Sequence, residues 1–165
     1  MADFESLRIE NPEFLYESFS LTGKEGEITL GFRFSLGDTV FTPTTRIKTD
    51  NLNIINAFDS PAARRIAFCL GMVEAVSYWK AACPPTVRVL CGSLGGADVL
   101  WFQKLWFSGL GAFFYRNGIT TELNSFVNIV CEGEALPGGG DFVSAGLNII
   151  PVGGGKDSAV TTELL

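Results

Sequence analysis

Apolar and polar residues alternate along the first part of the chain. The regular apolar positions are Ile28, Leu30, Phe32 and Phe34. An apolar side chain at every second position is typical of a strand with one face on a core. Glycine-containing polar segments at 22–26 and 35–38 read as turns. Residues 12–48 are therefore predicted to form an antiparallel meander of about three strands, with an edge or a break at Pro43.

Residues 61–82 follow the period of a helix instead. Ser60 followed by Pro61 is a helix start, because serine caps a first turn and proline suits its first position. Cys-Pro-Pro at 83–85 is a stop. The residues predicted for the apolar side are Ile66, Leu70, Val73 and Ser77, thickened by Phe68, Met72, Ala75 and Trp79.

A second long helix is predicted from about Ala97 to the glycine signal at Asn117-Gly118. Its aromatic stretch is the one membrane candidate in the sequence. Polar residues near its middle, with Lys104 the most costly, favour a buried helix, because a central lysine costs about 3 kcal/mol in lipid. A short strand is expected before this helix, at 86–91. The segment 121–131 fits a helix or a strand.

The charge and the cysteines exclude several classes of protein. A net charge of −6, with scattered basic residues, argues against a nucleic-acid-binding surface. The four cysteines have no CxxC spacing and histidine is absent, so no zinc site is expected. The first ten residues do not resemble a secretory signal. Reduced, buried thiols in a cytoplasmic protein are the simplest expectation.

The last segment of the chain carries the most specific chemistry. An apolar run at 147–152 leads into Gly153, Gly154 and Gly155, and then into Lys156-Asp157-Ser158 and a predicted helix. A strand, a glycine turn and a helix start form a phosphate cradle, because glycine lets the backbone approach an anion and the helix offers free N–H groups. The Walker and dinucleotide glycine patterns do not fit these residues.

The segment resembles the PP-loop of the ATP pyrophosphatase superfamily, Ser-Gly-Gly-x-Asp-Ser. Residues 153–158 match every fixed position except the first, where Gly153 replaces serine. The resemblance implies that ATP is split between its α and β phosphates and that AMP is attached to a substrate oxygen. A glycine turn in a linker is the alternative, and Pro-Gly-Gly-Gly at 137–140 shows that such turns occur here.

The predicted fold is α+β, with two parts. Residues 1–136 would form an N-terminal domain in which the antiparallel meander packs on two long helices, and 137–142 would be a linker. Residues 143–165 would begin an α/β, HUP-like PP-loop domain that is truncated, because such a domain needs several parallel strands. The isolated chain of 165 residues is therefore expected to be inactive.

Three further segments, with the PP-loop, resemble the bacterial UDP-N-acetylmuramoyl-L-alanyl-L-glutamate epimerases, the MurL family. They are SYWKAACPP at 77–85, FYRNG at 114–118, and the strand-rich start with 32–34 and 41–42. The resemblance covers nearly the whole chain and about the first third of such a protein. It implies inversion of the terminal L-glutamate of UDP-MurNAc-L-Ala-L-Glu to D-glutamate for peptidoglycan synthesis, with ATP and Mg²⁺ consumed as AMP and pyrophosphate form.

The resemblance also assigns roles to residues. Backbone N–H groups of 153–158 would hold phosphates, Lys156 would neutralise charge, Asp157 would hold the turn or approach magnesium, and Ser158 would cap the helix and donate to an oxygen. The residues that could bind the anionic precursor are Lys80, Tyr115, Arg116 and Asn117. The alternative for Lys80 and Arg116 is a favourable interaction with a helix C-terminus.

The residues that would move the Cα proton cannot be identified from the sequence. Cys83 or Cys91 could act as a thiolate base, and a buried structural thiol is the alternative. Two other functions stay open, namely another PP-loop adenylating enzyme of the amide-ligase type, or a binding module without catalysis. The sequence does not predict the oligomeric state.

Overall fold

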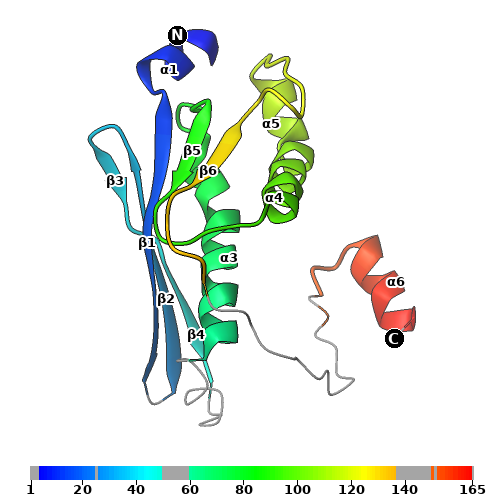
Figure 1. The fold of residues 1–165 in the computed structure, drawn as a ribbon. Helices are drawn as coiled ribbons and strands as arrows, with labels where there is room; N and C mark the ends of the chain where they lie inside the picture. Colours follow the sequence, from blue (N-terminus) through cyan, green and yellow to red (C-terminus); the bar gives the residue numbers. More distant parts are fainter. Residues whose placement is uncertain (1–3, 25, 50–59, 137–149, 151, 165) are drawn as a thin grey trace.

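The computed structural model describes residues 4–24, 26–49, 60–136, 150 and 152–164. A twisted six-stranded sheet carries its long helices on one face (Figure 1). The strands are β1 Glu13–Lys24, β2 Glu27–Leu36, β3 Thr39–Phe41, β4 Thr44–Lys48, β5 Thr86–Val89 and β6 Asn128–Cys131. The helices are α1 Phe4–Glu10, α3 Pro61–Trp79, α4 Gly96–Gly109, α5 Gly111–Arg116 and α6 Lys156–Leu164.

The predicted meander forms, with one more strand than expected. β1 and β2 make a long antiparallel hairpin in which Phe19 lies opposite Phe32, and the register shifts by one residue between Tyr16 and Ser18. β3 and β4 both pair antiparallel with β2. The break between them contains Pro43, whose carbonyl accepts a hydrogen bond from Phe32 N–H at 3.0 Å. The prediction of a break at this proline is confirmed.

The rest of the sheet is parallel, so an antiparallel meander alone was the wrong description. The strand order is β3-β2-β1-β5-β6, with β4 also on β2. β5 pairs parallel with β1, and β6 pairs parallel with β5. The sequence did not show whether the segment 121–131 is a helix or a strand, and its last four residues form strand β6. Parallel neighbours need a crossover connection, and α3 and the α4–α5 pair supply the two crossovers.

Helix α3 packs on the sheet, and fewer of its apolar residues are buried than the sequence predicted. The buried residues are Ala67, Phe68, Gly71, Met72, Ala75 and Trp79, whereas Ile66, Leu70 and Val73 are exposed. Apolar residues surround much of this helix, so periodicity alone did not select the buried side. The helix also ends at Trp79, three residues early, and Cys83 then takes a left-handed backbone conformation with φ of 53°.

The second predicted helix is two helices, α4 and α5, separated at Leu110. Trp106 anchors α4, because its indole N–H donates to the Met72 carbonyl at 3.0 Å and its ring lies 6.0 Å from that of Trp79. The predicted buried helix is buried on one side only, with Phe102 and Trp106, whereas its outer side, which includes Trp101, is exposed. None of the helices in the described part of the chain is long and apolar enough to cross a membrane.

The sheet face away from the helices is polar. The Arg88 guanidinium contacts the carboxylates of Glu13 at 3.2 Å and Glu132 at 2.6 Å, which joins strands β1 and β5 to the end of β6. Hydrogen bonding from Arg88 lowers the pKa of Glu132. Helix α1, which the sequence did not predict, is fastened by Arg8, whose Nη1 donates to the Cys83 carbonyl at 2.7 Å.

A glycine at position 71 is needed for the contact between α3 and the hairpin. A Cβ atom there would lie 1.9 Å from the Tyr16 hydroxyl oxygen. We therefore expect Gly71→Ala to lower the free energy of unfolding by about 1–3 kcal/mol or more, because the core must shift. Urea unfolding followed by circular dichroism measures it. Gly109→Ala in α4, where a Cβ meets nothing within 4 Å, is the matched control; equal losses in both variants would contradict this account.

Candidate functional site

The glycine loop before α6 has the backbone that an anion cradle requires. Gly154 has a φ of 76°, in the left-handed region that favours glycine, and α6 begins two residues later at Lys156. The predicted helix start is thus present. Most of the predicted strand at 147–152 lies outside the described residues, as do 137–142 and the start of the predicted second domain. The two described residues of that run, Ile150 and Val152, are not in a strand.

The N–H groups at the start of α6 are available to a ligand. The first backbone hydrogen bond of the helix runs from Ala159 N–H to the Gly155 carbonyl at 3.3 Å. The N–H groups of 156–158 precede it and have no acceptor within the helix. A Cβ at Gly153, Gly154 or Gly155 would meet nothing within 4 Å. An open turn with three N–H groups that have no backbone acceptor among the described residues is a fit for phosphate oxygens.

The side chains of Lys156 and Asp157 in this loop are also exposed. Ser158 is half-buried, and its hydroxyl donates to the Gly155 carbonyl at 3.0 Å. Neither of the exposed residues Lys156 and Asp157 takes part in an ion pair among the described residues. Helix α6 has no buried residue. The conformation of the loop is therefore determined by its own backbone and by the hydrogen bond of the Ser158 hydroxyl.

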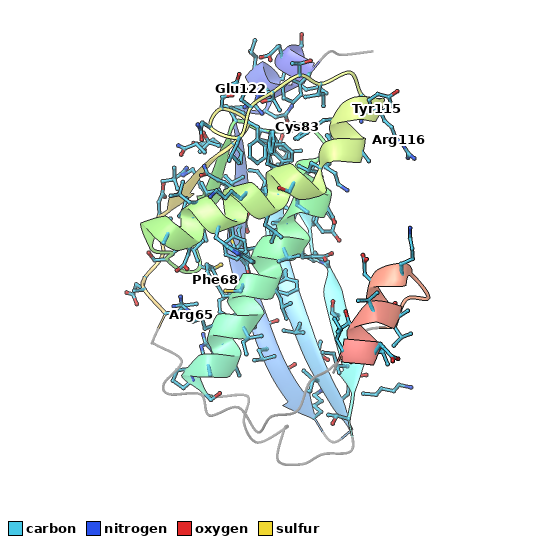
Figure 2. All side chains as sticks on the ribbon, turned by 90° about the vertical axis from the view of Figure 1, so that its right-hand side faces the viewer. Arg65, Phe68, Cys83, Tyr115, Arg116 and Glu122 are labelled. Atoms are coloured by element: carbon cyan, nitrogen blue, oxygen red, sulfur yellow. The ribbon has the colours of Figure 1, made fainter. Side chains whose placement is uncertain are left out.

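The four candidate substrate-binding residues lie at two helix ends. Lys80 is the half-buried C-cap of α3. Tyr115 and Arg116 lie at the end of α5 and point outward (Figure 2), and Tyr115 is 89% exposed. Asn117 donates to the Phe113 carbonyl at 2.8 Å and so closes that helix. No hydrogen bond, ion pair or ring contact between described residues joins Lys80 to the end of α5.

The two candidate thiols are protonated at neutral pH. Burial raises the pKa of Cys83 to about 11 and that of Cys91 to about 12, from an ordinary value of 9.0. The Cys83 thiol is directed to the Lys80 carbonyl at 3.7 Å. A thiolate is the reactive form of cysteine, so these surroundings favour the structural interpretation of both residues. No group of three or more metal-binding side chains occurs among the residues described.

A second strand–glycine–helix segment, which sequence reasoning treated only as a loop, follows β5. Gly95 is the N-cap of α4, and the Asp98 carboxylate in its first turn pairs with Arg65 at 3.4 Å. Close packing accounts for Gly92, where a Cβ would lie 2.7 Å from the Phe68 ring, but not for Gly96, where a Cβ would meet nothing within 4 Å. Both α4 and α6 carry a carboxylate in the first turn, but Asp98 is held by an ion pair, whereas Asp157 has none among the described residues.

The protonation of the two thiols gives a test by alkylation. At pH 8 we expect Cys83 and Cys91 to react slowly with iodoacetamide in the folded chain and at the ordinary thiol rate in urea, because folding raises both pKa values. The same protons stabilise the fold fully below pH 9, and this stabilisation is lost as the pH rises through 11 to 12. Peptide mass spectrometry measures the rates, and rapid labelling of either folded thiol would refute the assignment.

Comparison with known proteins gives a family match over nearly the whole chain. The MurL N-terminal domain family matches residues 6–165. A protein named UDP-N-acetyl-alpha-D-muramoyl-L-alanyl-L-glutamate epimerase from Xanthomonas oryzae pv. oryzae is 29% identical over 157 residues, which are 92% of this chain and 33% of the relative. A protein of the same name from Salinispora tropica is 28% identical over 160 residues, 97% of this chain and 32% of the relative.

A shorter match involves a different kind of protein. Over 102 residues the chain is 31% identical to a protein named probable potassium transport system protein Kup from Methanosarcina acetivorans, covering 61% of this chain and 17% of that protein. This match is too short in both chains to indicate a family. The chain spans about a third of the length of the epimerases that it matches. By its match over residues 6–165, the chain belongs to the MurL N-terminal domain family.

Proposed function

We propose that this chain is the N-terminal portion of an ATP-dependent epimerase that acts on UDP-MurNAc-L-Ala-L-Glu. The enzyme adenylates the terminal L-glutamate carboxylate and inverts the residue to D-glutamate, and AMP and pyrophosphate are released. The observation that carries the proposal is the exposed N-terminus of α6 behind the left-handed Gly154, in a chain whose relatives are named as epimerases. We place the reaction in the cytoplasm, where both ATP and the UDP-linked precursor are made.

The chemical problem explains why ATP is needed. Removal of the Cα proton beside a free carboxylate places two negative charges next to each other. Activation of the carboxylate by ATP removes its charge and makes Cα acidic enough for a side-chain base. Pyrophosphate leaves as the acyl-adenylate forms. After the proton returns to the other face of Cα, water hydrolyses the acyl-adenylate to the D-glutamate carboxylate and AMP, and this makes the sequence of steps effectively one-way.

The loop supplies the groups that would hold the phosphates. The backbone N–H groups of 156–158 donate to phosphate oxygens, and the partial positive charge of the helix start adds to their attraction. Lys156 neutralises further negative charge. Asp157, exposed and without an ion pair among the described residues, supplies a carboxylate that can approach magnesium.

Binding of the precursor is assigned to the end of α5. Tyr115 and Arg116 are exposed there, and Gly118, with φ of 62°, ends the helix behind them. A guanidinium suits the anionic groups of the precursor. Lys80 belongs to the same proposal as a separate cationic contact at the end of α3. Neither Cys83 nor Cys91 is assigned as the Cα base, since burial keeps both thiols protonated.

The glycine loop provides a matched pair of variants for the test. Gly154→Ala forces a left-handed backbone on alanine, whereas Gly153→Ala places a Cβ in open space without a positive φ. In the protein at the length its gene encodes, we expect Gly154→Ala and Asp157→Ala to slow ATP-dependent pyrophosphate release about tenfold or more, a change of roughly 1.4 kcal/mol in the barrier. We expect Gly153→Ala to act much less. Full pyrophosphate release by Asp157→Ala would refute the assignment of this loop.

A further inference from the structure

Helix α3 carries an apolar stripe on the side away from the sheet. Its members, Ile66, Leu70 and Val73, follow the spacing i, i+4, i+7 and are all exposed. The opposite side of the helix, which includes Phe68 and Met72, is buried. A helix that needed only the sheet as its partner would present polar residues outward. This helix is apolar on two sides.

Helix α4 extends this apolar surface. Its outward residues Leu100, Trp101 and Leu105 are exposed. Two contacts hold the relevant parts of the helices together: Arg65 pairs with Asp98 at 3.4 Å, and Trp106 donates to the Met72 carbonyl at 3.0 Å. Along the chain, Ile66 and Leu70 lie between the two contacts on α3, Val73 directly follows Met72, and the three apolar residues of α4 lie between its two contacts. Figure 2 looks onto both helices in front of the sheet, with Arg65 and Phe68 labelled on α3.

These residues make up the α3–α4 face, which we define as Ile66, Leu70, Val73, Leu100, Trp101 and Leu105. Their exposed fractions run from 38% for Leu105 to 61% for Ile66. Single exposed apolar residues are ordinary, but a group of six on two adjoining helices marks a surface that meets another surface. Trp101 makes the contrast clear, because the other two tryptophans, Trp79 and Trp106, are 0% and 2% exposed.

We infer that the α3–α4 face docks the part of the protein that follows the N-terminal domain in full-length members of this family. The match covers 33% and 32% of the two epimerases, so two thirds of each relative lies outside it. The matched family is by its description an N-terminal domain. A domain within the same chain is present at high effective concentration, so a moderate apolar patch suffices to hold it. The inference does not depend on the adenylation chemistry.

Oxidative labelling of Trp101 tests the docking directly. The chain of 165 residues and the protein at the length its gene encodes are exposed to hydroxyl radicals, and the oxidation of each residue is followed by peptide mass spectrometry. We expect Trp101 to be oxidised readily in the shorter chain and several-fold more slowly in the longer protein. Tyr115, which is 89% exposed and lies on α5 outside the face, is the control for radical dose.

Three outcomes would overturn the inference. Equal oxidation of Trp101 in the two proteins would show that nothing covers the face. A gene that ends at residue 165 would leave no segment to cover it. Protection of Trp101 in the shorter chain with rising protein concentration would identify a second copy as the occupant. The two oxidation outcomes would not bear on pyrophosphate release, so failure of the docking and failure of the proposed function are distinguishable by them; a gene that ends at residue 165 would remove both.

A pair of variants adds an independent readout. Trp101→Ser removes the largest side chain of the face, and Tyr115→Ser removes an exposed aromatic outside it. We expect Trp101→Ser to lower the thermal midpoint of the longer protein and to leave the shorter chain unchanged, because the side chain is covered only in the former. Tyr115→Ser should leave both unchanged. An equal shift of both proteins by Trp101→Ser would contradict docking at this face.

Discussion

The close approach of α3 to the β1–β2 hairpin is the constraint on which the rest of the fold depends. The Tyr16 hydroxyl fills the space beside Gly71 and donates to the Phe68 carbonyl at 3.4 Å. Burial raises the pKa of Tyr16, so the phenol stays neutral in the core. With α3 fixed at this depth, Trp79 reaches Trp106 and so sets the position of α4. Both crossovers of the parallel half of the sheet are built on this packing.

Local signals in the sequence predicted much of the fold, and non-local ones did not. The alternation around Phe32, the cap at Ser60 and the break at Pro43 depend on neighbouring residues, and all three were correct. Strand pairing between β1 and β5 joins residues far apart in the chain, so no local pattern reveals that it is parallel. The sequence also failed to identify the buried side of α3. Because apolar residues lie on two sides of this helix, their spacing does not show which side packs on the sheet.

In the candidate site too, local features could be predicted from the sequence, and features that depend on distant residues could not. Gly154 has the positive φ and α6 the start that the glycine pattern required, because both follow from a few consecutive residues. The roles of Lys80 and Arg116 depend on how separate elements meet a substrate, which spacing cannot specify. The sequence left a thiolate base at Cys83 or Cys91 open beside the structural interpretation, and only the fold decides between them, because burial raises the pKa of both thiols. The apolar α3–α4 face became visible only once the buried side was known.

The central claim is that this family domain serves an ATP-dependent inversion of glutamate. The most direct measurement gives the protein, at the length its gene encodes, ATP, magnesium and UDP-MurNAc-L-Ala-L-Glu in D₂O, and determines the chirality and Cα deuterium content of the glutamate. We predict D-glutamate carrying deuterium at Cα, formed only with ATP. Glutamate that stays L and unlabelled while ATP is consumed would contradict the account and leave an adenylating enzyme with another acceptor.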